Sequence, residues 1–161
     1  MPASLRMFRR DIMIFCFFSS MPFVGFWSGI LYHRMDKIGT NTVALLSDTF
    51  VTVIFVCISS ALTTAILLKR TYKGGVLPVL KTKEKFWGFF PDRPWAFGFV
   101  LGVYSSIGLT FFFDTTYEFF AWGSITMTQF VLVKMGYSGL LGSLVAGFAV
   151  HKMLSVRAAA Q

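Results

Sequence analysis

The sequence predicts an all-α membrane protein with four transmembrane helices in two hairpins. Its 161 residues are 55% hydrophobic and 14% charged, whereas soluble domains carry about 25% charged residues. The apolar residues form four runs close to the ~20 residues that span a bilayer. A basic segment, residues 69–95, separates these runs into two pairs. We therefore expect a single transmembrane domain over residues 1–161.

The first span is predicted over about residues 13–32. A basic segment, residues 1–11, precedes it and contains three arginines. This segment fits a short basic tail, the start of a mitochondrial targeting segment or the basic region of a secretory signal. The span contains Pro22, which predicts a local kink. Its Gly25-x-x-x-Gly29 pair predicts close approach of another helix.

The second span is predicted over about residues 49–68, with Asp48 at its N-cap. Hydroxyl side chains follow one side of this helix. They fit a polar pathway, or hydroxyls that bond to their own helix or to a neighbouring helix. The hydroxyl residues are Thr52, Ser59, Ser60, Thr63 and Thr64.

The connector over residues 69–95 mixes basic and aromatic side chains. Such a mixture can bind single-stranded nucleic acid. Beside a membrane span it more often lies at the interface, with rings among the headgroups and charges in water. We therefore expect anionic lipid headgroups as partners and no nucleic acid. The interfacial residues are Lys81, Lys83, Lys85, Trp87, Arg93 and Trp95.

The third and fourth spans are predicted over about residues 96–113 and 130–150, and the fourth helix has an alternative start at Ile125. Both contain small residues four positions apart, a spacing that predicts close helix packing. These residues are Gly98 and Gly102 in the third span and Gly139, Ser143 and Gly147 in the fourth.

The distribution of basic residues predicts the orientation. The N-terminal segment holds three Lys/Arg, the connector seven and the C-terminal segment two, whereas the other two loops hold only Arg34 and Lys37. The positive-inside rule places both chain ends and the connector in the cytoplasm or matrix. We expect an integral protein of the bacterial cytoplasmic membrane or the mitochondrial inner membrane.

Two short matches between the helix pairs have the pattern that a parallel duplication would leave, although they are too short to establish one. Residues 17–20 (FFSS) match residues 103–106 (VYSS), and residues 68–70 (LKR) match residues 150–152 (VHK). Further parts of this layout are Asp48, residues 50–70, the Phe90-Pro91 pair and residues 143–154. Together these features resemble small bacterial four-helix membrane proteins of unknown function, which are built from tandem hairpins. The resemblance implies no catalytic residues.

Lys134 is the most unusual residue, because a charge deep in a membrane span is costly and often functional. With a helix start at Ile125, it forms a polar cluster together with Asp114 and Glu118, which Gln129 and Asp48 could join. With a start near Phe130, it extends to the interface instead.

No residue pattern predicts a cofactor or a catalytic site. Cys16 and Cys57 are expected as packing residues, and His33 and His151 lie a membrane thickness apart. Phosphate-binding loops, zinc motifs and nucleophile elbows are missing from the sequence. We expect bound lipids but no metal or other cofactor.

The sequence therefore favours a non-catalytic accessory subunit of a larger membrane complex, with an energy-converting complex as the commonest host. Its partners would be membrane lipids and either other membrane subunits or further copies of itself. The alternative is a small oligomeric transporter or channel that uses Lys134 and the hydroxyl residues of the second span.

Overall fold

The computed structural model describes residues 3–32, 37–39, 43–72, 88–119 and 124–159. Four long helices and two short strands make up this part of the chain. All four helices are long and apolar enough to cross a membrane. The helices are α1 (Ala3–Tyr32), α2 (Val43–Thr71), α4 (Pro94–Phe119) and α5 (Met127–Ala159), and the strands are β1 (Lys37–Gly39) and β2 (Ser124–Thr126).

The helices extend beyond the apolar runs that predicted them. Helix α1 begins at Ala3 and so includes the basic N-terminal residues, and it continues through Pro22. Helix α4 ends at Phe119 rather than near residue 113. Helix α2 begins at Val43, so the prediction that Asp48 is its N-cap is wrong. Hydrophobicity marks the part of a helix that suits a membrane, whereas backbone hydrogen bonding can continue into polar sequence.

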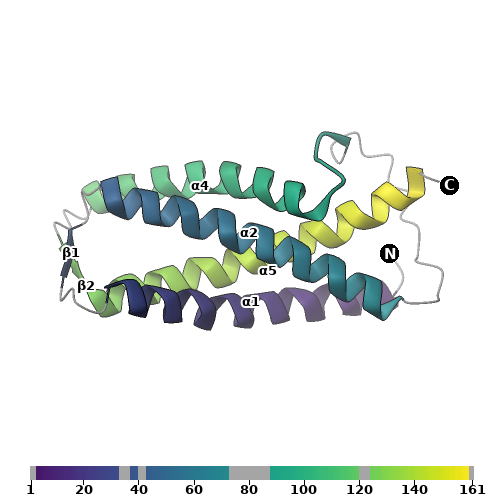
Figure 1. Ribbon diagram of the computed structural model, residues 1–161, viewed down its shortest axis with the longest axis horizontal. Helices are drawn as coiled ribbons and strands as arrows, with labels where there is room; N and C mark the ends of the chain where they lie inside the picture. The colour runs from purple at the N-terminus through teal and green to yellow at the C-terminus, as the bar shows by residue number, and fades with distance from the viewer. Residues whose placement is uncertain (1–2, 33–36, 40–42, 73–87, 120–123, 160–161) are drawn as a thin grey trace.

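Helices α2 and α5 cross at the centre of the bundle, and α1 and α4 lie on its two sides (Figure 1). Helix α1 packs mainly on α5, and α4 packs mainly on α2. Accordingly, 44% of the apolar segment of each central helix is buried, against 22% for each outer helix. The two helices of each expected hairpin, α1 with α2 and α4 with α5, scarcely touch. The hairpins therefore exist in connectivity but not as packed pairs.

The two strands join the loops at one end of the bundle. Strand β1 pairs with β2 in antiparallel register, with Ile38 opposite Ile125. Neither strand was expected from the sequence. We call this end the β end (Figure 1). The opposite end carries Arg6, Arg9 and Arg10 of α1, Lys69 and Arg70 of α2, Arg93, and Lys152 of α5; we call it the basic end.

Small residues bring the paired helices together. A Cβ atom on Gly98 would lie 2.7 Å from the Cys57 carbonyl oxygen of α2, and one on Gly102 would lie 2.8 Å from Ile54 Cα. Between α1 and α5, Gly25 of α1 faces the Met135 side chain, and Gly139 and Gly147 of α5 face the Met21 and Met13 side chains. Close approach of one backbone to another, which small residues allow in membrane helices, occurs at Gly98 and Gly102.

The packing has the pattern that a repeat would produce. Exchanging α1 with α4, α2 with α5 and β1 with β2 turns the α1–α5 contact into the α4–α2 contact. The same exchange maps the antiparallel β1–β2 pair onto itself. The arrangement therefore has an approximate two-fold relation between the halves of the chain, consistent with the short sequence matches.

Candidate functional site: a buried ion pair beside an apolar cavity

A capping box fixes the position of Lys134 by setting the start of α5. The Thr126 backbone N–H donates to Gln129 Oε1 over 3.0 Å, and the Gln129 N–H donates to Thr126 Oγ1 over 3.3 Å. This reciprocal pattern is typical of helix N-termini. With α5 starting at Met127, Lys134 lies about 10 Å along the helix, at about 1.5 Å per residue.

Lys134 pairs with Asp48 of α2 near the β end. The Lys134 Nζ to Asp48 Oδ2 distance is 2.5 Å, and the side chains are 3% and 16% exposed. The ammonium also lies 5.3 Å from the centre of the Phe130 ring, within cation–π range. The Lys134 side chain is buried, so it does not extend to the membrane interface. Extension to the interface was one of the two interpretations of the sequence.

The ion pair borders a cavity of about 290 Å³ between α1 and α2. The cavity exists because these two helices scarcely contact each other along their length. Its walls are almost entirely apolar, and Asp48, Lys134 and the hydroxyls of Ser28 and Thr52 supply the polar groups. The apolar lining residues are Phe23, Val24, Trp27, Leu31, Val51, Phe55 and Val56.

Aromatic rings form part of the cavity wall. Phe23 of α1 and Phe55 of α2 stack with their centroids 5.6 Å apart and their planes 5° apart. The Trp27 ring meets Phe23 edge to face at 6.3 Å. The stacked pair thus bridges α1 and α2 where backbone contacts are few, and offset ring pairs of this kind add stability beyond their buried area.

This arrangement holds two opposite charges in an environment of low polarity. Burial of both ions carries a large desolvation cost, which their attraction repays only with good geometry. The pair therefore fixes the register of α2 against α5, since sliding either helix would leave a buried charge unpaired. It also offers one donor and one acceptor to anything that enters the cavity.

The other residues of the expected polar cluster lie elsewhere. Gln129 belongs to the capping box of α5. Asp114 and Glu118 lie in the last turns of α4, and their side chains fall outside the described residues. Among the described side chains of this cluster, Lys134 and Asp48 are the two that lie together.

Of the five hydroxyl residues predicted along one side of α2, two donate hydrogen bonds to their own helix. Ser59 Oγ donates to the Val56 carbonyl over 3.1 Å, and Thr64 Oγ1 donates to the Ser60 carbonyl over 2.7 Å. Such back-bonding satisfies a hydroxyl inside a membrane helix. Thr52 alone among them lines the cavity.

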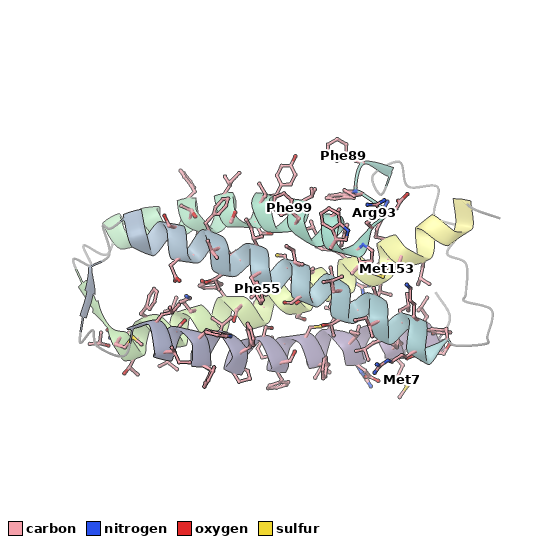
Figure 2. The ribbon with its side chains drawn as sticks, in the orientation of Figure 1. Met7, Phe55, Phe89, Arg93, Phe99 and Met153 are labelled. Atoms are coloured by element: carbon pink, nitrogen blue, oxygen red, sulfur yellow. The ribbon has the colours of Figure 1, made fainter. Side chains whose placement is uncertain are left out.

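Of the expected interfacial residues, Arg93 and Trp95 are described and both are exposed. Arg93 and Met7 lie on opposite sides of the basic end (Figure 2). Lys81, Lys83, Lys85 and Trp87 lie outside the described residues.

Lys152 is a buried charge that the sequence interpretation missed. Its Nζ lies 2.8 Å from Asp92 Oδ1, with Lys152 5% exposed and Asp92 70% exposed. This pair ties the C-terminal part of α5 to the residues just before α4. A lysine at the end of an apolar run looks interfacial in sequence, so nothing distinguished it from a solvated charge.

Cys16 and Cys57 are both free and buried. His151 lies near the end of α5, while His33 falls outside the described residues. Among the described residues, no group of three His, Cys, Asp or Glu side chains has the arrangement of a metal site.

Comparison of the chain with protein-family models, curated proteins and solved structures found no match.

Proposed function

We propose that this chain is a non-catalytic integral membrane protein and an accessory subunit of a larger membrane complex. Its four helices cross the bilayer, with both chain ends and the basic connector on one side. Its role is structural: it presents apolar helix faces to neighbouring membrane subunits.

The observation that carries the proposal is the aromatic surface of α1 and α4. Each outer helix packs mainly on one partner, which leaves most of its circumference uncovered. Figure 2 shows Phe99 on the outer side of α4. Large rings in membrane helices pack well against further helices, because association there depends on van der Waals contact. The exposed rings are Phe15, Phe18, Phe23, Phe26 and Trp27 on α1, and Trp95, Phe99, Tyr104, Phe111 and Phe112 on α4.

An open glycine on an outer helix, α1 or α4, marks where a neighbouring helix could approach. A Cβ atom on Gly29, Gly108 or Gly136 would have nothing within 4 Å. Most other small residues are already used between α1 and α5 and between α2 and α4. Few glycines are therefore left for contacts with neighbouring subunits, and Gly108 on α4 is the clearest case among the described residues.

The test is extraction of the tagged full chain in a mild detergent, followed by native electrophoresis and mass spectrometry. A subunit co-purifies with fixed membrane partners in constant ratio. Elution of the chain alone as a monomer would rule out the proposal.

A variant pair locates the contact. Gly108→Leu adds bulk to the outer face of α4, where the bundle has open space, and is expected to release partners while the four-helix fold persists. Gly136→Leu makes the same chemical change at an open position of α5 and serves as the matched control.

A second candidate is a small oligomeric transporter or channel. One observation favours it: Thr52 and the Asp48–Lys134 pair face the same cavity. A hydrated pathway would make a Thr52→Cys variant react with small water-soluble thiol reagents in intact membranes. In an accessory subunit that position is dry, and the reagent leaves it unmodified.

A further inference from the structure

A second hollow, of about 540 Å³, lies at the basic end along one face of α1. Arg6, Arg9 and Arg10 line one part of it, and Met13, Ile14, Phe17 and Phe18 line the rest on the α1 side. Among the described residues, Ser143 of α5 is the only contribution from another helix. We call this hollow the arginine groove.

The dimensions of the groove match one leaflet of a bilayer. From Arg6 to Phe18, α1 rises about 18 Å at 1.5 Å per residue. One leaflet contributes about 15 Å of hydrocarbon. The groove therefore changes from cationic to apolar over the distance at which a membrane changes from headgroup to acyl chain.

The charge of the groove is only partly balanced. Arg10 Nη2 lies 3.1 Å from Asp11 Oδ1, whereas Arg6 and Arg9 have no carboxylate partner among the described residues. Arg9 Nε is buried and has no hydrogen-bond acceptor within this described part of the chain. Two guanidinium groups without a described carboxylate partner thus line the hollow, and Arg9 Nε itself is packed near Gly147 of α5.

The repeat provides an internal comparison. Aligning residues 17–20 with residues 103–106 places Asp92, Trp95 and Ala96 at the positions of Arg6, Arg9 and Arg10. Helix α4 packs on α2 as α1 packs on α5, yet it lacks this cationic set. The fold itself therefore does not require three arginines on this face.

We propose that the arginine groove binds an anionic glycerophospholipid, with its phosphate on Arg6 and Arg9 and an acyl chain along Met13, Phe17 and Phe18. Guanidinium groups form paired, charge-assisted hydrogen bonds with phosphate oxygens. Clusters of basic residues beside a membrane span attract anionic headgroups in this way. A zwitterionic lipid would bring a second cation beside the arginines. This inference rests on the proposed membrane insertion, but not on any partner subunit.

The test uses the full chain purified in a neutral detergent. Native mass spectrometry measures the binding of phosphatidylglycerol and of phosphatidylcholine with identical acyl chains. We expect at least about fivefold tighter binding of phosphatidylglycerol, the effect of about one effective charge near a membrane surface. Inorganic phosphate is expected not to displace phosphatidylglycerol, since phosphate cannot fill the apolar part of the arginine groove. Equal binding of the two lipids, or displacement by phosphate, would overturn the proposal.

Two double variants with the same charge change separate the groove from general surface charge. Arg6→Gln with Arg9→Gln is expected to abolish the preference for phosphatidylglycerol. Lys69→Gln with Arg70→Gln changes two exposed residues of α2 at the same end, outside the groove lining. This second variant is expected to keep the preference for phosphatidylglycerol. Equal losses in both would show that no specific site exists.

Cross-linking of the unaltered chain covers the case in which a variant does not fold. Phosphatidylglycerol with a photoreactive acyl chain should label α1 between Met13 and Phe18. Labelling spread evenly over the apolar faces of α2 and α4 would contradict the proposal. Because the isolated chain is used, either result leaves the accessory-subunit proposal to its own co-purification test.

Discussion

At the scale of single residues, the Asp48–Lys134 pair places two charges where hydrocarbon is the expected surrounding. Its distance of 2.5 Å and its burial mean that each charge depends on the other. Removing one partner of a buried pair typically costs more than the pair contributes, because the remaining charge stays desolvated. Replacing both by apolar residues of similar size is often nearly neutral. The pair therefore specifies which arrangement of α2 and α5 forms.

A double-mutant cycle tests this at Asp48 and Lys134. Lys134→Met and Asp48→Leu are each expected to lower the free energy of unfolding by about 3 kcal/mol. The combined variant should return to within about 1 kcal/mol of the unaltered protein. Denaturant titration in detergent, followed by circular dichroism, measures all four proteins. Additive losses in the combined variant would show that the two side chains are not coupled.

The sequence identified Lys134 but not its partner. A lysine within an apolar run is visible without a structure, and Asp48 was one of several acidic candidates. What singles out Asp48 is the crossing of α2 over α5, a long-range contact that no local pattern encodes. The cavity beside the pair was unpredictable for the same reason, because it depends on the separation of α1 from α2.

At the scale of helices, glycine decides how closely two backbones approach. Gly98 and Gly102 lie against backbone atoms of α2, whereas Gly29 faces open space although its sequence spacing from Gly25 is the same. A small-residue motif therefore indicates a capacity for packing, and the fold determines which members use it.

Alanine substitutions at Gly98 and Gly29 should have opposite outcomes. Gly98→Ala would place a Cβ atom 2.7 Å from α2 backbone atoms, and we expect it to lower the free energy of unfolding by about 2 kcal/mol. Gly29→Ala meets nothing within 4 Å and should leave stability unchanged or raise it by up to about 1 kcal/mol. Melting temperatures in one detergent compare them. Similar losses at both positions would contradict the α2–α4 contact.

The start of α5 gives a second prediction at this scale. Thr126→Ala removes the hydroxyl that caps the helix and should cost about 1 kcal/mol. Faster hydrogen exchange in the first turn of α5 would accompany the loss. Thr128→Ala, an exposed threonine two residues later, is the matched control and should exchange as the unaltered chain does.

The positions of the helices were largely predictable from sequence, and their packing was not. Runs of apolar residues marked all four helices, because a bilayer span needs about 20 of them. The Thr126-x-x-Gln129 pattern of a capping box also marks the start of α5 in the sequence. The contacts of α1 with α5 and of α4 with α2 join segments far apart in the chain, and hydrophobicity alone does not rank such pairings.

At the scale of the whole molecule, positive charge gathers at one end of the bundle. Of the described basic side chains, Lys134 lies toward the β end and is neutralised by Asp48. The other described basic side chains lie at the basic end. They belong to α1, to the end of α2, to the residues just before α4 and to the C-terminal part of α5. In a membrane this asymmetry predicts a single orientation, with the basic end on the cytoplasmic or matrix side.

Single cysteines introduced at the two ends test this orientation in sealed vesicles. Ser4→Cys and Arg93→Cys, at exposed positions of the basic end, should react with a membrane-impermeant maleimide from the same side. Thr128→Cys, near the β end, should react only from the opposite side. The native Cys16 and Cys57 are buried and should stay unlabelled, so the unaltered chain gives the background. Labelling of positions 4 and 93 from opposite sides would mean an odd number of crossings between them, which the positive-inside argument does not allow.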